Sequence, residues 1–588
     1  MRNLLRSSEH SPRLNGGDRL VMWLVTAVYA VFTLLNLGTL SFPQTVWSST
    51  AGERAVVDLG EERDVSAVWF NGNIAIGRML LTADDGNNLE YEQVYGEMFS
   101  WRKKPVSFHT RYIGLNVLSG DIALNEIAFL DETGARIPAS IQDPVGSQSA
   151  LLDENDTVPE AASYYNGMIF DEIYHARTAY EFIHGMSVYE WTHPPLGKAL
   201  ISLGIRVFGM TPFGWRVVPA LLGAGLLPVI FLLGKRFFRR RDHAFLAQAL
   251  MALDTMHFTQ TRIATVDVFI VFFILWMFFF MTDHLRADYL HDPMKKLLLP
   301  LGACGVSFGL GVASKWTGLY AGAGLAVLFF SNLIQAGIRA GRKGEGRLFW
   351  TRTWKILLFC IGFFIVIPCL IYFFSYLPFY RYESARRPDV TFGLKEALQI
   401  LIQQQKSMYG YHSGLTATHL CQSAWYEWPF AERSVWFYFG SSGNKISSIS
   451  SFGSPAVWWI SAVGALALLV EAIFGRMGKD PVYRKKAAWI LLIAVAANLF
   501  PWMLVTRCTF QYHYFPTIPF VVLAAVLLLQ HLEERGEIPG WGKWCWLGLA
   551  ALYFLLLLPA ASGIPMPRLY ARFIEYVLPA GVIFHGAV

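Results

Sequence analysis

The sequence predicts a mainly α-helical, polytopic membrane protein with about eleven transmembrane helices and one β-sandwich domain outside the cytoplasm. Three observations support this fold class. Of 588 residues, 54% are hydrophobic and only 16% are charged, whereas soluble domains are nearer a quarter charged. The apolar residues fall in blocks of roughly 20, long enough to cross a bilayer core. One polar stretch near the N-terminus alternates with the period of a β-strand.

The N-terminal segment sets the predicted topology. Residues 1–19 are polar and carry Arg2, Arg6, Arg13 and Arg19, and an apolar run follows over residues 20–40. This run is too long for a signal-peptide core and no small-residue cleavage site follows it, so it is interpreted as the first transmembrane helix. Because basic residues favour the cytoplasmic side, the N-terminus is predicted to be cytoplasmic.

Residues 44–145 predict the β-sandwich. Segments such as SAVWFNG and RMLLTADDG alternate apolar and polar residues and are separated by turn signals. The stretch resembles the discoidin, or F5/8 type C, family in DLG at 58–60, TADDG at 82–86 and LNEIAF at 124–129. The resemblance implies the sandwich fold, and two roles stay open for the domain: it binds acceptor or glycan, or it serves as a rigid spacer.

The remaining apolar blocks complete the predicted membrane region. They lie at 216–234, 244–260, 263–282, 297–313, 317–335, 354–375, 455–474, 487–505, 515–531 and 545–562. Basic residues gather in alternate loops, at 235–241, 295–296, 339–347 and 476–486. All these loops fall on the side of the N-terminus, so the C-terminus is predicted outside. The expected parts are a membrane region over 160–375, a large outer loop over 376–454, and a C-terminal four-helix region with an outer tail over 455–588.

The first outer loop after the sandwich carries the strongest candidate motifs. It contains FDEIYHAR at 170–177 and THPPLGK at 192–198. Residues 171–184 predict an amphipathic helix ended by Gly185, with Asp171 and His175 on one face. The prolines at 194–195 break the chain before a second short helix, which is expected to lie along the membrane interface.

Ionisable residues are predicted near the outer ends of several spans, where they are costly and therefore suggest function. The set comprises Arg216, Asp254, Arg262, Asp267, Lys315 and Arg507. Each residue also has an ordinary structural explanation. Asp171 and Glu172 can cap a helix, Arg216 or Lys315 can extend to headgroups, and Asp254 can pair with Arg262. His412, His419 and His513 can be packed histidines.

Other site classes find little support in the sequence. The six cysteines and the histidines show no metal-like spacing, so no bound metal and no disulfide framework are predicted. A Gly-rich phosphate loop is also missing from the sequence, which argues against a nucleotide-driven pump. No cofactor and no nucleic-acid partner are expected.

Several segments together resemble the protein O-mannosyltransferases, which belong to the GT-C class of glycosyltransferases. They run in family order: FDE at 170–172, HPPLGK at 193–198, GWRVVPALLG at 214–223, TRIATVD at 261–267, SKWTGLY at 314–320, YHSGL at 411–415, HLCQSAWYEWP at 419–429, GSPAVWW at 453–459 and RCTFQYHYFP at 507–516. The resemblance implies a GT-C fold and an inverting, metal-independent transfer of mannose from a polyprenyl-phosphate carrier to Ser or Thr hydroxyls of secreted or membrane proteins.

The resemblance also implies roles for residues. Asp171 would be the catalytic base, and Glu172 would help to position the acceptor or sugar. Donor and phosphate binding would fall to Arg216, Arg262, Lys315, His412, Arg507 and His513. Asp267, with Asp254, would be a second acidic position. Further positioning of acceptor or sugar would fall to His193, Tyr411 and Trp425.

Departures of this sequence from the family's motifs indicate which kind of family member it resembles. Gly453-Ser454-Pro455 replaces the usual G-N-P, and Trp191 stands where the family has an acidic residue before H-P-P, with Glu190 one step further away. The loop 376–454 is too short for the β-trefoil of eukaryotic members. A bacterial-type enzyme of the plasma membrane is therefore expected, with its active site and sandwich on the outer face, in contact with membrane lipids.

Two rival functions remain open at this point. One is a GT-C enzyme that uses another sugar or a lipid or polysaccharide acceptor. The other is a non-catalytic transporter or flippase with a sugar-sensing outer domain. A transporter is expected to show inverted repeats with interrupted helices. The sequence shows no such symmetry, so the enzyme is favoured.

Overall fold

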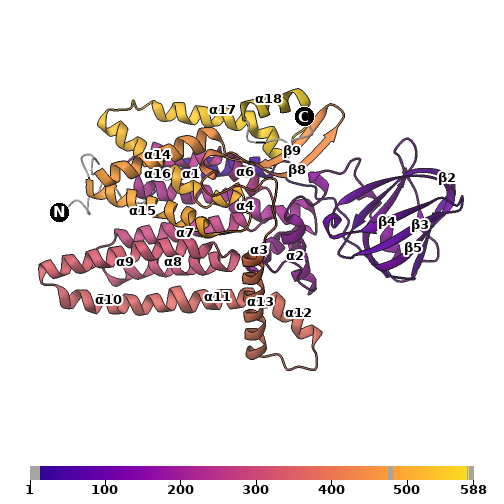
Figure 1. The fold of residues 1–588 in the computed structure, drawn as a ribbon, viewed down its shortest axis with the longest axis horizontal. Coiled ribbons are helices and arrows are strands. Elements are labelled where there is room, and N and C mark those ends of the chain that lie inside the picture. The colour runs from indigo at the N-terminus through magenta and orange to yellow at the C-terminus, as the bar shows by residue number, and fades with distance from the viewer. Residues whose placement is uncertain (1–13, 475–480, 579–580, 582–588) are drawn as a thin grey trace. The chain divides into compact units, whose positions relative to one another are not determined.

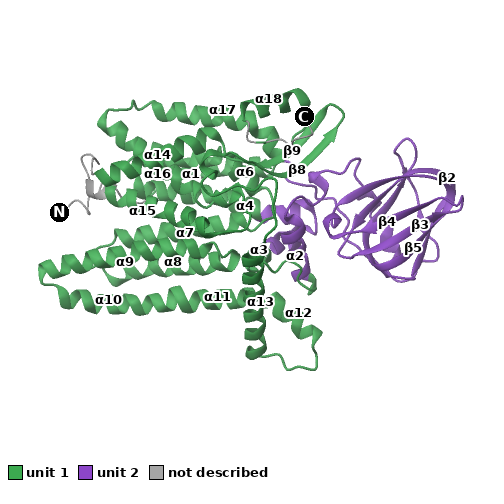
Figure 2. Cartoon of the chain, in the orientation of Figure 1, with its two compact units in different colours: residues 1–35, 184–200, 219–588 green, residues 36–183, 201–218 purple. Residues whose placement is uncertain are grey.

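A computed structural model of the chain describes residues 14–474, 481–578 and 581. The chain forms two compact units, coloured separately in Figure 2: unit 1 contains residues 1–35, 184–200 and 219–588, and unit 2 contains residues 36–183 and 201–218. Arg2, Arg6, Arg13, Arg476 and Lys479, on which the predicted topology partly depends, lie outside the described residues.

Unit 2 contains a seven-stranded sheet over part of the stretch predicted to be β-structure. The strand order is β4-β3-β5-β2-β7, with β1 and β6 also paired to β5. Trp69 of β2 lies opposite both Lys103 and Ala128, so this part of β2 has segments of β5 on both sides. The strands are β1 (Trp47–Thr50), β2 (Arg54–Gly72), β3 (Gly77–Ala83), β4 (Asn88–Gln93), β5 (Trp101–Leu130), β6 (Arg136–Ile137) and β7 (Ser140–Ile141).

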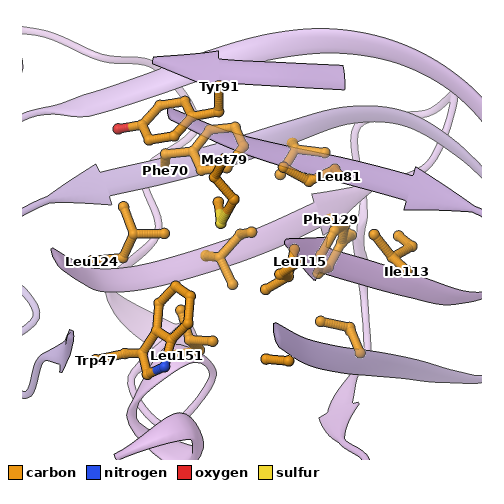
Figure 3. Packing of buried hydrophobic residues seen from close by; sticks show 14 of the residues in the cluster. Trp47, Phe70, Met79, Leu81, Tyr91, Ile113, Leu115, Leu124, Phe129 and Leu151 are labelled. Carbon is orange, nitrogen blue, oxygen red and sulfur yellow. The ribbon is translucent and has the colours of Figure 1, made fainter. Parts of the chain in front are cut away.

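Alternating apolar side chains of these strands form one hydrophobic core (Figure 3). Met79 and Leu81, two positions apart in β3, are both fully buried. Phe70 stacks on Tyr91 with ring centroids 4.1 Å apart. The period-two pattern thus correctly predicted a separate β-domain in this part of the chain.

Unit 1 is predominantly helical (Figure 1). Its helices are α1 (Gly16–Leu34), α5 (Arg241–Ala252), α6 (Thr255–Thr261), α7 (Asp267–Arg286), α8 (Met294–Ser314), α9 (Gly318–Lys343), α10 (Gly346–Ile361), α11 (Ile367–Ser375), α12 (Leu377–Arg386), α13 (Leu394–Gly414), α14 (Pro455–Phe474), α15 (Pro481–Leu499), α16 (Ile518–Arg535), α17 (Gly542–Ser562) and α18 (Arg568–Val577). Helices α2 (Glu172–His184), α3 (Leu196–Phe208) and α4 (Pro212–Phe237) have residues in both units.

Nine helices within the described residues are long and apolar enough to cross a membrane. They match nine of the eleven predicted blocks. The block 244–260 instead holds the short helices α5 and α6, because Asp254 caps a new helix and interrupts the apolar run. The block 515–531 forms α16, which ends in Glu533, Glu534 and Arg535.

The predicted outer loop 376–454 is largely folded. It contains α12, α13 and a hairpin of β8 (Val435–Ser442) and β9 (Lys445–Ser451), which β10 (Met566–Pro567) extends to three strands. In Figure 1, α13 runs crosswise to α10 and α11. A π-helical turn at Gly362–Val366 joins α10 to α11. The outer loop therefore contributes a crosswise helix whose C-terminal end carries His412.

Candidate functional site

Asp171 occupies a constrained turn at the start of α2 in unit 2. The preceding residue, Phe170, has φ of 47°, a left-handed conformation that is unusual for a bulky side chain. The carbonyl of Asp171 accepts the N–H groups of Tyr174 and His175, both at 3.0 Å. The Asp171 side chain is partly exposed, whereas Glu172 beside it is fully buried. The turn thus holds one carboxylate at the surface of unit 2 and one in its interior.

Glu172 forms a buried ion pair with Arg216 of α4, also in unit 2. Arg216 Nε donates to Glu172 Oε1 at 2.7 Å, and Nη2 donates to Oε2 at 2.6 Å. The other guanidinium N–H groups donate to the carbonyls of Leu37, Tyr164 and Gly167, at 2.7–3.0 Å. All five N–H donors of Arg216 are therefore engaged within unit 2.

These contacts correct the expected roles of both residues. Arg216 was expected to bind the donor phosphate, but it has no donor left for one. Glu172 was expected to position acceptor or sugar. Its carboxylate instead holds Arg216 and accepts the Ile169 N–H at 3.0 Å. Both residues fix the Asp171 turn, because Glu172 follows Asp171 directly in the chain.

A second group of ionisable residues lies in unit 1, where α7 begins and α8 ends. Lys315 Nζ donates to Asp267 Oδ1 at 2.7 Å, and both side chains are largely buried. Asp267 is the first residue of α7, and Lys315 caps the C-terminus of α8. The Lys315 ammonium lies 6.0 Å from the centroid of the Tyr512 ring. The structure thus brings together two residues that the sequence predicted at the same level.

Three histidines lie near this pair in unit 1. The rings of His193 and His412 are 5.7 Å apart, and His513 stacks on Tyr512 at 4.6 Å. His412 Nε2–H donates to the carbonyl of Thr192 at 2.8 Å. This bond leaves His412 Nδ1 as the acceptor nitrogen. Nδ1 is buried and has no hydrogen-bond partner among the described residues.

The electrostatics of this group follow from burial and two cations. Burial is the largest cause that lowers the pKa of His193, of His412 to about 4, and of His513. Lys315 lowers all three pKa values further, and Arg507 lowers those of His412 and His513. The histidines are therefore neutral at pH 7, and Lys315 and Arg507 carry the positive charge. We call these five residues the cation–histidine cluster.

The segment 190–198 is fastened by a lysine that sequence analysis did not assign to the site. Lys198 is fully buried and donates to the Glu190 carboxylate and to the carbonyl of His193. Glu190 also contacts His193 Nδ1 at 3.1 Å and accepts the Thr192 N–H at 2.8 Å. Glu190 and Lys198 therefore hold both His193 and the Thr192 carbonyl in place. Their spacing around Pro194-Pro195 was the available signal.

Aromatic side chains line the same region. Tyr411 lies edge-on to Trp191 at 5.9 Å. Trp316 Nε1 donates to Tyr372 at 3.0 Å, and the Tyr372 hydroxyl donates to Gln405 of α13 at 2.6 Å. These bonds tie α13, which carries His412, to the start of α9 and to α11. Trp425 packs on Tyr426 and Phe500 instead.

Two further predicted residues have structural roles in unit 1. Arg262 Nη1 donates to the carbonyls of Thr33 and Leu35 at 2.6 and 2.7 Å, at the C-terminus of α1. Asp254 accepts the His257 N–H at the start of α6, and it accepts Trp458 Nε1 at 2.8 Å. The expected Asp254–Arg262 pair is thus wrong, and both groups satisfy helix ends.

Within the described ranges, no group of three or more His, Cys, Asp or Glu side chains is arranged to hold a metal ion.

Comparison with known proteins decides the family. Residues 207–380 match the family model described as dolichyl-phosphate-mannose-protein mannosyltransferase. Residues 397–573 match the model for the C-terminal four-transmembrane region of protein O-mannosyltransferase. The two matches together cover more than half of the chain. The chain belongs to the protein O-mannosyltransferase family.

Curated relatives agree with this assignment. A polyprenol-phosphate-mannose–protein mannosyltransferase of Mycobacterium tuberculosis is 27% identical over 455 residues, covering 68% of this chain and 84% of the relative. The enzyme of the same description from Corynebacterium glutamicum is 27% identical over 429 residues, covering 64% and 78%. The family, the mannosyltransferase activity and the multi-pass membrane character that the sequence predicted are confirmed.

The fold of the chain agrees with that of a solved protein O-mannosyltransferase. A Saccharomyces cerevisiae protein O-mannosyltransferase complex bound to the sugar donor contains a chain that aligns with a TM-score of 0.59 at 13% identity. The alignment covers 70% of this chain and 88% of the yeast chain. The mannosyltransferase described here therefore shares its overall fold with this yeast relative.

Proposed function

We propose that the protein transfers mannose from a polyprenyl-phosphate-mannose donor to Ser or Thr hydroxyls of extracytoplasmic proteins, with inversion at the anomeric carbon. The observation that carries the proposal is the cation–histidine cluster of unit 1. It combines two cations with three neutral imidazoles, which suits a ligand that has a phosphate at one end and sugar hydroxyls at the other.

Lys315 and Arg507 bind the phosphate of the donor. In the transfer, the acceptor oxygen forms a bond to the anomeric carbon while the bond from that carbon to the phosphate oxygen breaks. Polyprenyl phosphate leaves with the electron pair and gains negative charge. Fixed cations at that oxygen stabilise the transition state, because charge develops there. Asp267 holds the Lys315 ammonium in position.

His412 contacts the sugar and not the phosphate. Its neutral ring cannot supply a positive charge, but its buried Nδ1 can accept an O–H from a mannose hydroxyl. A buried acceptor that lacks a partner costs free energy, and a sugar hydroxyl relieves that cost. This assignment replaces the phosphate-binding role expected from the resemblance.

Asp171 is the general base that takes the proton of the acceptor hydroxyl. Two features of unit 2 support this role. The side chain is partly exposed, and its backbone is fixed by the left-handed Phe170 and by the Glu172–Arg216 pair. A fixed carboxylate loses little orientational freedom in the transition state, which favours proton transfer.

An apolar groove of unit 1 suits the polyprenyl chain of the donor. It has a volume of about 490 Å³ and is lined by Leu196, Ala199, Ile367, Leu370, Ile371, Phe374, Ser375, Leu377 and Pro378. The groove shares α3 with Lys198 and α11 with Tyr372, both of which belong to the hydrogen-bond networks around the cluster. A lipid chain in this groove would bring its phosphate to the same helices.

The sheet of unit 2 is proposed to be a discoidin-like sandwich on the outer face of the plasma membrane. The bacterial relatives and the cytoplasmic N-terminus expected from the basic loops support this orientation. The sandwich would bind the acceptor protein or its glycan, or act as a spacer.

The test is a transfer assay with purified protein, polyprenyl-phosphate-mannose and a Ser/Thr-rich peptide, read as a mass increase of the peptide. Asp171→Asn is expected to abolish transfer, and Glu160→Gln, which changes an exposed carboxylate of the same unit, is expected to retain it. A matched peptide with Ala at every Ser and Thr checks the acceptor atom. Near-normal turnover in Asp171→Asn would overturn the assignment of the base.

A further inference from the structure

A second site lies on unit 1 where α1, α5 and α17 begin. A pocket of about 560 Å³ is lined by Val21, Arg240, Arg241, Asp242, Phe245 and Trp544. Val21 and Trp544 belong to helices that are apolar and long enough to cross a membrane, and both lie near the first residue of their helix. The pocket is therefore expected at the boundary between bilayer and water.

The charges around this pocket do not balance. Asp18 contacts Arg241 at 2.7 Å and Lys235 at 3.1 Å. Asp242 contacts Arg240 at 2.6 Å and Lys543 at 2.9 Å, and Lys543 also reaches Glu533 at 3.2 Å. Among the described residues, Asp242 and Glu533 balance Arg240 and Lys543, whereas the single carboxylate of Asp18 faces two cations, Arg241 and Lys235. One positive charge is therefore left over, in the group formed by Asp18, Arg241 and Lys235.

The side chains of two of these cations are exposed at the surface of unit 1. The side chains of Arg240 and Arg241 are 63% and 43% exposed, although both are paired. Beneath them the pocket wall is apolar, with Phe245 and Trp544 in ring contact at 6.1 Å. Indole rings favour the interfacial region of a bilayer, where one side is apolar and the other wet. Exposed arginines above an apolar wall match an amphiphilic anion.

We propose that this pocket binds an anionic phospholipid, with the phosphate at Arg240 and Arg241 and one acyl chain along Val21, Phe245 and Trp544. A phosphodiester without an ammonium group supplies the missing negative charge. A zwitterionic lipid would bring its own cation beside the arginines, which is unfavourable. This site uses none of the residues of the cation–histidine cluster, so it is independent of the proposed transfer reaction.

Binding would connect three helices that are far apart in the sequence. A ligand that binds the folded state but not the unfolded state raises stability by mass action. An anionic lipid at this site is therefore expected to raise the unfolding temperature of the protein.

The test measures lipid binding to the full chain in detergent by native mass spectrometry, with phosphatidylglycerol and phosphatidylcholine as probes. Arg240→Gln is expected to weaken phosphatidylglycerol binding about fivefold, which is the contribution of one basic residue near an anionic headgroup. Asp242 keeps Lys543 as its partner in this variant, so the fold is retained. Trp544→Leu is expected to weaken binding of the same lipid.

Lys296→Gln is the matched control. Lys296 is 65% exposed and pairs with Asp292 at 3.0 Å, much as Arg240 pairs with Asp242. It is expected to bind phosphatidylglycerol as the unsubstituted protein does, and the lipid is expected to raise its unfolding temperature equally. The proposal is overturned if Lys296→Gln loses as much binding as Arg240→Gln, or if phosphatidylcholine binds as tightly as phosphatidylglycerol.

Discussion

Glu172 and Arg216 are 44 residues apart in the chain and are joined by two short, buried hydrogen bonds in unit 2. Because the remaining guanidinium donors bond to the carbonyls of Leu37, Tyr164 and Gly167, this arginine joins two stretches of chain, one at Leu37 and one over 164–172, around the Asp171 turn. We propose that Arg216 preorganises the proposed base and that the cations of unit 1 bind the donor phosphate.

Breaking this pair is expected to unfold the protein before it affects donor binding. Glu172→Gln leaves a buried guanidinium without its countercharge, which costs about 3–5 kcal/mol. The measurement is thermal unfolding in detergent. Arg78→Gln is the control, because its pair with Glu90 is half exposed and contributes about 1 kcal/mol or less. A Glu172→Gln protein with normal stability and weakened donor binding would show instead that Glu172 and Arg216 bind the donor.

Removal of the Lys315 charge is expected to slow transfer and also to lower stability, because the largely buried Asp267 carboxylate loses its cation, so rates are compared per folded protein. Lys315→Gln should lower kcat about 100-fold, in the range seen when one charge-stabilising group is removed from an active site. Lys406→Gln, an exposed lysine of α13, is the control and is expected to keep full activity. The assay is the initial rate of peptide mannosylation at saturating donor. A rate within twofold of normal would contradict phosphate binding by Lys315.

The neutral His412 predicts a pH dependence of stability. Its folded pKa of about 4 lies below the ordinary value of 6.5. Between these values the unfolded chain binds the proton and the folded chain does not, so stability is expected to fall as pH is lowered from 6.5 towards 4. His412→Asn removes this contribution and is expected to show a shallower loss in thermal unfolding.

His291→Asn is the control for that experiment, because His291 is exposed and lies on a different loop. An equally steep loss of stability in His412→Asn and in the unsubstituted protein would show that the ring is not held neutral.

Donors that lack one mannose hydroxyl provide a second test of the role of His412. If one mannose hydroxyl bonds to Nδ1 of His412, a donor that lacks this hydroxyl is expected to lower the transfer rate of the unsubstituted enzyme more than that of His412→Asn.

Filling the apolar groove is expected to weaken binding of the polyprenyl chain and to leave binding of the sugar unchanged. Ala199→Phe adds a ring where Leu370 and Phe374 line the wall. The variant is expected to raise KM for long polyprenyl donors several-fold and to leave a short-chain donor unaffected. Leu552→Phe, on an exposed face of α17, is the control. Equal effects on both donors would place the carrier chain elsewhere.

Much of this organisation could be predicted because it depends on local pattern. The apolar blocks predicted the helices, and period-two alternation predicted the β-domain. The motifs that carry Asp267, Lys315, His412 and His513 lie close together in unit 1, while their roles in binding the donor stay a prediction. Counting apolar residues differed from the structure at two blocks: Asp254 caps a new helix inside 244–260, and the block 515–531 forms α16, which ends in charged residues.

Residues whose role depends on distant backbone could not be predicted. Arg216, Arg262 and Lys315 are all cations near the ends of helices, and their sequence contexts do not differ in kind. Arg216 and Arg262 bond to carbonyls of segments more than 40 residues away, and only the folded chain shows this. Lys198 was missed for a different reason: its partner Glu190 is close in sequence, but the pair becomes significant only because both side chains are buried.

The bonds from Lys198 to Glu190 and His193 close a short noncovalent ring around two prolines. A ring of this kind leaves the segment few alternative shapes in the absence of substrate. Its ordering is completed during folding, and docking of a substrate requires no induced fit from it. Movement of this loop is therefore not expected to limit turnover. Exchange of the lipid substrate and product is expected to be the slow step.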